Sequence, residues 1–412
     1  MLTLTKYELF KLFKRKKTWV VIIAFILLTG LLVYGDRRDA ENEKKYSNPD
    51  YIMQMNNQQI SMLESEKNNI PENIKDDNTK IDEYKNNLDQ NISSLKEENE
   101  NLKQQKLMEQ SSNDNWKQSI DEQIKNNETA LANSSSSASA KKNDESLRSN
   151  NEQLKYLKNH DIKPSNHYDF NAYRALQNVM KNLGQLFLLI GVAVFVADMV
   201  SGEATPPTLK LLLTQPVSRG KVLLSKFLAI SIAAAASILL VEIGAFIVTG
   251  IMYGFGNSNY PVIVGTQYHI DTSIIQDGKH PLRAIMGSSY IIPNWQYTLE
   301  FLGLQMLYVI TVVSVTFMIS SLVKSSMISM GISTVGFIAV MVLLNTVQFF
   351  KNLMLYIFLG YTDFSSVLSG DIAMLINKAN PKIYFVVIVL LAWTAISYAI
   401  SHLVFTKKDI LV

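Results

Sequence analysis

The segment Ser201–Lys226, SGEATPPTLKLLLTQPVSRGKVLLSK, lies between two long apolar stretches and decides the fold. It holds one acidic residue, Glu203, and its basic residues are Lys210, Arg219, Lys221 and Lys226. Short loops rich in Lys and Arg remain on the cytoplasmic side of a membrane. We therefore expect a cytoplasmic loop that joins two membrane-spanning helices and that a soluble partner could contact.

The composition favours a membrane protein over other classes. Apolar residues are gathered in blocks, and a very polar stretch at about 36–178 separates the first block from the rest. A net charge of +3 over 412 residues gives no support for nucleic-acid binding. The absence of cysteine excludes disulfides and thiolate sites, and none of the five histidines has the spacing of a helical metal site, so no metal is expected.

Six apolar segments are long enough to cross a bilayer as helices. We predict an all-α integral membrane protein with both termini in the cytoplasm of a bacterial cell, because the segments assigned to the inner side are all basic. Its parts are an interfacial helix at 1–17, spans at 18–35, 179–200, 224–252, 298–322, 327–350 and 383–405, outer segments at 36–178, 253–297 and 351–382, a cytoplasmic loop at 201–223 and a tail at 406–412.

The N-terminal segment 1–17 has the composition of a helix that lies in the membrane interface. Apolar residues alternate there with basic residues that include Lys11, Lys14, Arg15, Lys16 and Lys17. Such a helix buries its apolar side at the headgroup boundary while lysine side chains reach water. The alternative is a signal peptide, which we disfavour because no small-residue cleavage pattern follows Tyr34.

The outer segments differ from one another. In 36–178 we expect an antiparallel helical hairpin, because apolar residues recur every seven positions at Ile74, Ile81, Leu88, Leu95 and Leu102 and a return arm is indicated from Trp116 to Leu157. The alternative is a partly disordered stalk. We predict an irregular loop at 253–297 with a short strand at Tyr260–Val264, and short re-entrant helices at 351–382.

No motif for catalysis is present. The chain lacks a phosphate-binding Gly-x-x-x-x-Gly-Lys-Ser/Thr sequence and the common hydrolase motifs, so we expect neither an enzyme nor a catalytic residue. Glu242 lies inside the predicted third span, where a carboxylate should face a cavity or a partner, and it is a candidate for the translocation path. Asp198 and Glu300, near span ends, are expected to be solvated at the interface.

The 201–226 segment resembles the loop of a type-2 (ABC-2, type V exporter) ATP-binding-cassette permease subunit. In that family an acid, a Thr-Leu pair, a leucine cluster and Pro-hydrophobic-Ser-Arg form a coupling helix that docks on the ATPase subunit. The matching residues are Glu203, Thr208, Leu209, Lys210, Leu212, Pro216, Val217, Ser218 and Arg219. Pro207 stands where the family usually has glycine. The alternative for this segment is an amphipathic loop packed on its own helices.

The resemblance implies a permease that pairs with a second copy or a relative and binds two cytoplasmic ATPase subunits, which hold the ATP and Mg²⁺. It implies outward transport or removal of an amphipathic substrate, such as an antimicrobial peptide, a drug or a lipid-like molecule. The alternative function is a membrane-anchored adhesion, sensor or secretion-scaffold protein that acts through the outer helical arm.

Overall fold

The computed structural model describes residues 1–412 except 72–77, 113–115, 133–137, 167, 204–216, 273–279, 377, 379–380 and 408–412. The chain divides into two compact units. One consists of residues 1–36, 133–156 and 171–412, and the other of residues 37–132 and 157–170. Helices α2 (Lys16–Tyr46) and α6 (Ala138–Asn159) contribute residues to both units.

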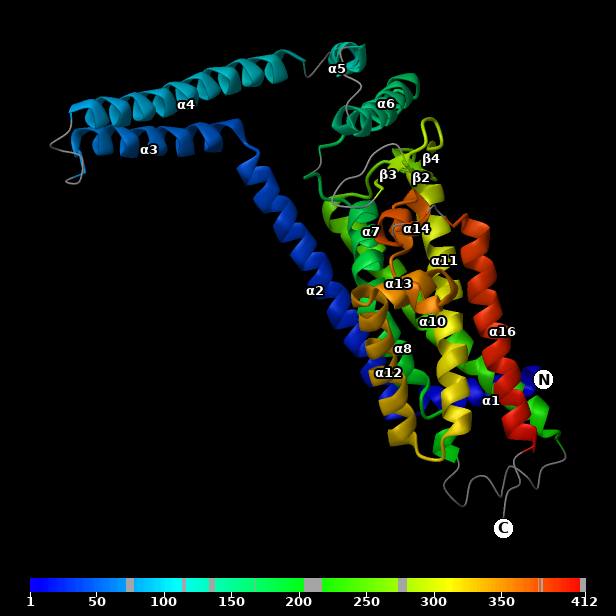
Figure 1. The fold of residues 1–412 in the computed structure, drawn as a ribbon. Helices are drawn as coiled ribbons and strands as arrows, with labels where there is room; N and C mark the ends of the chain where they lie inside the picture. The colour runs from blue at the N-terminus through cyan, green and yellow to red at the C-terminus, as the bar shows by residue number, and fades with distance from the viewer. Residues whose placement is uncertain are drawn as a thin grey trace. The chain divides into compact units, whose positions relative to one another are not determined.

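The first unit is a helical bundle with short strands at one end (Figure 1). Its main helices, besides the first part of α2, are α1 (Leu2–Phe13), α7 (Ala172–Asn182), α8 (Leu188–Val196), α10 (Arg219–Tyr253), α11 (Asn294–Leu322), α12 (Ser326–Thr346) and α16 (Ile383–Lys407). Of these, α2, α10, α11, α12 and α16 are each long and apolar enough to cross a membrane. The prediction of a mostly helical membrane protein is confirmed at this level.

The predicted second span is assembled from three consecutive helical pieces. Between α7 and α8 lies a π-helical turn, η2 (Leu183–Phe187), so neither α-helix alone has the length of a span. Gly184 sits in this turn, and a Cβ there would lie 2.8 Å from the Thr362 carbonyl oxygen and 3.0 Å from the Phe364 ring. The wider turn and the missing side chain together allow the 361–364 segment to pack directly on the helix.

Helix α11 is the centre of the bundle. In its most apolar stretch 61% of the residues are buried, compared with 22–33% in the other four long helices. Against α16 it presents hydroxyl groups: the Thr311 hydroxyl hydrogen-bonds that of Thr394 (3.1 Å), and the Ser314 hydroxyl donates to the Thr394 carbonyl (2.8 Å). Small residues with satisfied hydroxyls allow helices to approach closely in lipid, where the hydrophobic effect does not drive their association.

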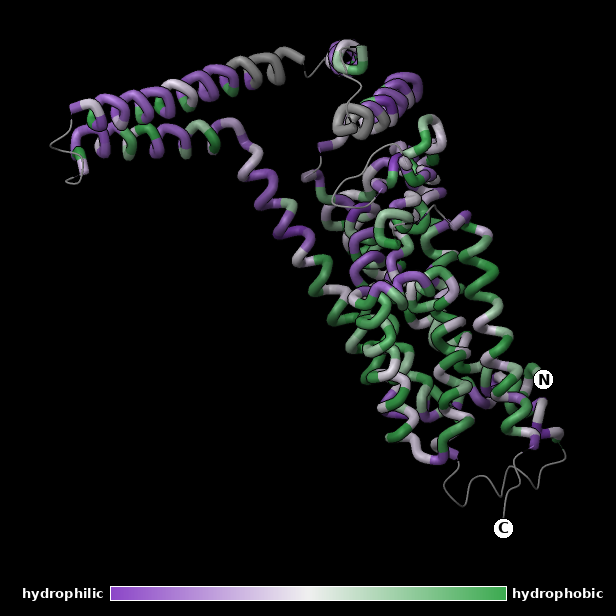
Figure 2. Tube along the Cα trace, in the orientation of Figure 1, coloured by the Kyte–Doolittle hydropathy of each residue, from purple (hydrophilic) through white to green (hydrophobic). Residues whose placement is uncertain are grey.

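The helices of the bundle consist largely of apolar residues, as the green tubes of Figure 2 show. Exposed large side chains include Leu27 on α2, Leu240 on α10, Val335 on α12 and Leu391 on α16. A surface of this extent requires lipid or another apolar protein surface around it.

Short strands lie between the end of α10 and the start of α11, and the first of them falls within the strand predicted at Tyr260–Val264. The strands are β1 (Pro261–Val264), β2 (Tyr268–Ile270), β3 (Leu282–Ala284) and β4 (Tyr290–Pro293), and the antiparallel pairs are β1 with β4 and β2 with β3. Gly265, with φ of +74°, separates β1 from β2. The alternation of β-branched and aromatic residues around prolines and glycines favours short paired strands over a loop.

Short helices fill the predicted re-entrant region. They are α13 (Gln348–Leu353), α14 (Phe364–Ser369) and α15 (Ile372–Ile376), with 3₁₀ turns η4 (Met354–Tyr356) and η5 (Phe358–Gly360). The Asp363 side chain caps α14 by accepting a hydrogen bond from the Ser366 amide, and Gly370 ends the helix in the left-handed conformation. Phe364 and Phe358 pack around the buried Tyr308 ring of α11. This region is therefore part of the bundle core.

The second unit contains an antiparallel helical pair, but the partners differ from those predicted. Helix α4 (Asn78–Ser112) packs on α3 (Pro49–Asn68) instead of on the return arm, which forms α5 (Trp116–Ala132) and α6. The buried side chains of α4 include Leu88, Ile92 and Asn99. The predicted heptad series that contains Leu88 is therefore accompanied by a second buried series four residues later, at Ile92 and Asn99. The Asn56 amide donates to the Asn99 carbonyl oxygen (3.0 Å), and such a buried polar pair favours a single register.

Candidate functional site

A sharp corner joins α1 to α2 at the N-terminal end of α10. The Thr18 hydroxyl and the Arg15 amide both donate to the Leu12 carbonyl (2.7 and 3.0 Å), and the Trp19 indole donates to the Phe13 carbonyl (2.9 Å). These bonds satisfy carbonyl groups that the last turn of a helix leaves without partners. The predicted single segment 1–17 is thus divided, since α1 ends at Phe13 and Lys16 begins α2.

The buried face of α1 packs on α10 and carries a carboxylate. It consists of Thr5, Glu8 and Leu12, which follow one another at helical spacing. Glu8 is 6% exposed, and its Oε1 lies 2.9 Å from the Lys226 ammonium of α10. The contact fixes α1 against α10 by charge as well as by apolar packing.

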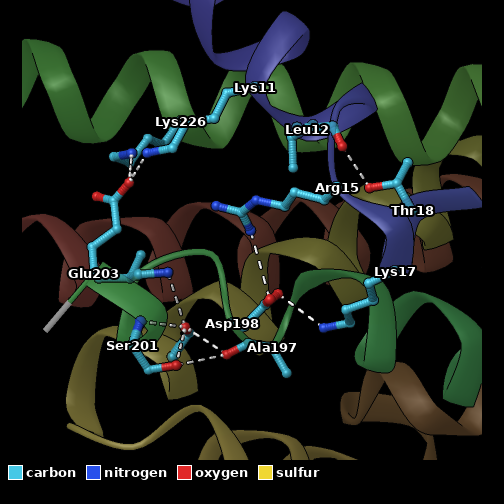
Figure 3. A network of polar contacts seen from close by, with 12 residues as sticks. Lys11, Leu12, Arg15, Lys17, Thr18, Ala197, Asp198, Ser201, Glu203 and Lys226 are labelled. Atoms are coloured by element: carbon cyan, nitrogen blue, oxygen red, sulfur yellow. Dashed lines mark hydrogen bonds and ion pairs between the residues drawn. The ribbon is translucent and has the colours of Figure 1, made fainter. Parts of the chain in front are cut away.

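Lys226 is the centre of a four-residue ion cluster, part of which Figure 3 shows. Its Nζ lies 2.7 Å from Glu203 Oε1 as well as beside Glu8, and its side chain is 1% exposed. Lys11 of α1 lies 2.5 Å from the same Glu203 oxygen. The four side chains belong to α1, to α10 and to the short turn η3 (Ser201–Glu203), which follows the predicted second span. Removing Lys226 would leave Glu8 buried without its ion-pair partner, whereas Glu203 would keep Lys11.

The electrostatics of this cluster hold Glu203 ionised. Burial by itself would raise the pKa of the Glu203 carboxyl, but the neighbouring Lys226 and Lys11 outweigh burial and bring the pKa below its ordinary value of 4.5. Glu203 lies outside the predicted spans, at the beginning of the loop that was predicted to be cytoplasmic. It is therefore a fixed negative charge that two cations from different helices share.

A second ion group ties the corner to the same stretch of chain. Asp198 lies 2.9 Å from the Lys17 ammonium and 3.6 Å from the Arg15 guanidinium (Figure 3). The expectation that Asp198 is merely solvated was wrong, because the α1–α2 corner brings two cations to it. Glu300, in contrast, accepts a hydrogen bond from Gln296 on its own helix (2.9 Å).

The turn that carries Glu203 is also anchored to the centre of the bundle. The Ser320 hydroxyl of α11 donates to the Ala197 carbonyl (2.7 Å) and accepts from the amides of Val200 and Ser201 (3.1 and 3.0 Å). One buried hydroxyl thus satisfies three backbone groups after α8. A displacement of Glu203 would be transmitted both to α1 and to α11.

The structure brings some of the predicted coupling residues together and does not describe others. Thr208, Leu209, Lys210, Leu212 and Pro216 lie outside the described residues. Glu203 is in the ion cluster, Val217 and Ser218 precede α10, and Arg219 is its first residue. The helix therefore begins earlier than the predicted span at 224–252.

The predicted interfacial cations have different environments. Lys11, Arg15 and Lys17 form ion pairs with protein carboxylates. Lys14 lies over the Phe10 ring, 4.4 Å from its centroid, and Lys16 is exposed. Hence only part of this basic set remains available to lipid headgroups.

Sequence reasoning missed Glu8 and counted Lys226 only among the basic residues of the 201–226 segment. A signal for Glu8 was present, because it is the one acidic residue in 1–17 and it shares a helix face with Leu12. For Lys226 the apolar neighbours Leu224 and Phe227 could have indicated burial. The pairing itself depends on how three distant segments meet.

Glu242 lies far along α10 from this cluster. Its side chain is 1% exposed, and its Oε1 accepts a hydrogen bond from the Gln305 amide of α11 (2.6 Å). Its other oxygen has no hydrogen-bond partner among the described residues. It borders a cavity of about 290 Å³ between α7, α10 and α11.

The comparison with protein families gives an extensive match. Residues 2–410 match the model described as "ABC-2 family transporter protein". No curated protein matches the chain at a significant level. Members of this family are membrane subunits that work with an ABC ATPase, which agrees with the five long apolar helices. The chain therefore belongs to the ABC-2 family of transporter proteins and is the membrane permease subunit of an ABC transporter.

Proposed function

We propose that this permease exports an amphipathic substrate, such as an antimicrobial peptide, a drug or a lipid-like molecule, and that the ion cluster passes the movement of the ATPase to the membrane helices. The observation that carries the proposal is Lys226, which holds carboxylates from α1 and from the turn before the loop at 2.9 and 2.7 Å. Glu203 immediately precedes the 204–216 segment, so the cluster connects α1 and α10 to the residue at which that segment starts.

The arrangement we propose has six spans, both termini in the cytoplasm and residues 36–178 outside the cell. The composite α7–η2–α8 supplies the sixth span. Two copies of the ATPase, which bind ATP and Mg²⁺, dock on the 201–226 loop, with Leu209, Lys210 and Leu212 in the contact. A second permease copy or a relative completes the transporter, and family membership favours this function over an adhesion or sensor role.

The rigidity of the cluster supports transmission of force. Lys226, Glu8 and Glu203 are all nearly inaccessible to solvent, so separating them would expose charges to an apolar environment. Exposed ion pairs contribute little and exchange readily, whereas buried ones resist separation. The two segments joined by the cluster are therefore expected to move as one body.

Co-purification and transport assays test docking and transmission separately. We expect Leu212→Asp to release the ATPase from the detergent-solubilised permease, because a charge replaces an apolar docking residue. Met286→Asp, a matched change at an exposed position beside β3, should leave the ATPase bound. We expect Glu203→Gln to retain the ATPase but to abolish the coupling of ATP hydrolysis to export.

Two results would contradict the proposal. One is an ATPase subunit that remains bound with Leu212→Asp at the level of the unmodified protein. The other is a Glu203→Gln variant that folds and exports normally, because the cluster would then have no part in transmission.

A further inference from the structure

The cavity beside Glu242 has the chemistry of a binding site for a cationic headgroup. It has a volume of about 290 Å³, and Tyr173, Phe246, Trp295, Thr298 and Glu242 are among its lining residues. Aromatic faces and a carboxylate together attract an organic cation. Among the described lining residues there is no Lys or Arg that could form an ion pair with Glu242.

Two buried hydrogen-bond acceptors lack donors, one on a lining residue of the cavity and one on the residue that donates to it. They are Glu242 Oε2 and Gln305 Oε1, both buried and without a hydrogen-bond partner among the described residues. The Gln305 amide nitrogen is already engaged with the other Glu242 oxygen at 2.6 Å. Buried acceptors without partners are costly and usually indicate an absent ligand, water or proton. A primary ammonium group carries three donors, and in the cavity it can donate to Glu242 Oε2.

The rim of the cavity is apolar and open. Ile243, Trp295 and Leu299 border it and are 42%, 46% and 59% exposed. These residues lie on the apolar outer surface of α10 and α11, where lipid is expected. Glu242 is eleven residues before the end of α10 at Tyr253, which is about 16 Å along the helix axis. A molecule can therefore enter sideways from the membrane, with its tail among the rim residues.

We infer that this cavity binds an amphiphile with a primary ammonium headgroup, whose nitrogen donates to Glu242 beside the aromatic residues of the lining. The inference deepens the proposed function, on which it rests for the export of what binds here. It names the substrate class as positively charged amphiphiles. The headgroup pairs with the carboxylate, and this pairing accounts for a buried acid within a membrane helix.

Binding is tested on the full-length permease alone, in phosphatidylcholine nanodiscs and without ATP. A variant with Trp295 as its one tryptophan (Trp19→Phe, Trp116→Phe and Trp393→Phe) reports on the cavity, because a bromoalkyl chain quenches tryptophan on contact. The probes are 12-bromododecylamine, its trimethylammonium analogue and 12-bromododecanol. We expect saturable quenching by the amine at concentrations about tenfold lower than for the other two probes.

Variants separate a specific site from general membrane partitioning. Glu242→Gln should weaken amine quenching about tenfold and leave quenching by the alcohol unchanged. Glu300→Gln, on the same helix as Trp295 but outside the cavity lining, should behave like the parent. Competition by added phosphatidylethanolamine would identify a membrane lipid as the source of the ammonium group, and its absence would indicate a foreign amphiphile.

Equal quenching by amine and alcohol would overturn the inference, since Glu242 would then be protonated or hydrated and the cavity merely apolar. Equal amine quenching in Glu242→Gln and Glu300→Gln would also overturn it. Neither result affects the docking of the ATPase. Conversely, loss of ATPase docking or coupling would refute the proposed function and leave amine binding intact.

Discussion

The residue with the largest expected energetic role is Lys226. Its side chain is 1% exposed and lies between two carboxylates, so its buried ammonium group is stabilised by ion pairs with Glu8 and Glu203. Removing one partner of a buried ion pair destabilises a protein far more than replacing both partners, because the remaining charge cannot recover its hydration. The cluster should therefore respond to single and paired substitutions in different ways.

We expect Lys226→Met to destabilise the permease by about 3–5 kcal/mol, because Glu8 loses its ion-pair partner and Glu203 keeps only Lys11. Lys221→Met, at an exposed position on the same helix, should change stability by less than about 0.5 kcal/mol. The double variant Lys226→Met with Glu203→Gln should cost less than the sum of the two single variants. The free energy of unfolding in detergent is measured for the three single variants and the double variant. Strict additivity of the Lys226→Met and Glu203→Gln effects would contradict the cluster.

Acid should weaken the same cluster over a defined range of pH. The pKa of Glu203 is lower in the folded protein than its ordinary value of 4.5, so folding favours the ionised form. Its contribution is complete above about pH 4.5 and is lost as the pH falls through the lowered pKa. The difference in melting temperature between the parent and Glu203→Gln should be constant from neutral pH to about 5 and should shrink in more acidic solution. A difference in melting temperature that grows as the pH falls would contradict a lowered pKa of Glu203 in the folded protein.

Among the structural elements, the π-helical turn η2 is the most informative. It breaks the second apolar stretch into α7 and α8 and allows the carbonyl of Thr362 to approach Gly184. The opposing group is backbone, which cannot rotate away as a side chain can. The position therefore has a requirement for glycine that depends on space rather than on backbone conformation.

We expect Gly184→Ala to destabilise the protein by about 1–3 kcal/mol, because a Cβ would lie 2.8 Å from the Thr362 oxygen. Gly303→Ala is the matched control, since a Cβ at Gly303 in α11 has no neighbour within 4 Å. That control should be neutral or stabilising by about 0.5–1 kcal/mol, because alanine favours a helix. Thermal unfolding measures both variants. Equal effects of the two substitutions would show that the turn tolerates a side chain.

At the scale of the whole molecule, the proposed function depends on the orientation of the permease in the membrane. The chain has no cysteine, so a single introduced cysteine reports its own accessibility without a background. We expect a membrane-impermeant maleimide added to intact cells to label Glu122→Cys in α5, which lies in the predicted outer segment. Ser218→Cys, which precedes α10, should be labelled only after the membrane is opened. The opposite pattern would place the ion cluster outside the cell and remove the basis for transmission.

The amino-acid sequence alone determined the class of the protein and the positions of its long helices. Apolar stretches of the length of a bilayer, such as those of α10, α11 and α16, are set by composition, and the motif from Glu203 to Arg219 pointed to the family that the comparison shows. These features are local, so reading along the chain is sufficient to find them.

The tertiary structure decided which charges meet. Glu8 pairs with Lys226, and Asp198 pairs with Lys17, although the partners are far apart along the chain. These pairs require the corner after Phe13 and the anchoring of the turn near Ser201 by Ser320. The same holds for Glu242 beside Gln305 and for the choice of α3 as the partner of α4. An ionic contact depends on a separation of a few ångströms between segments, and no pattern within one segment specifies that separation.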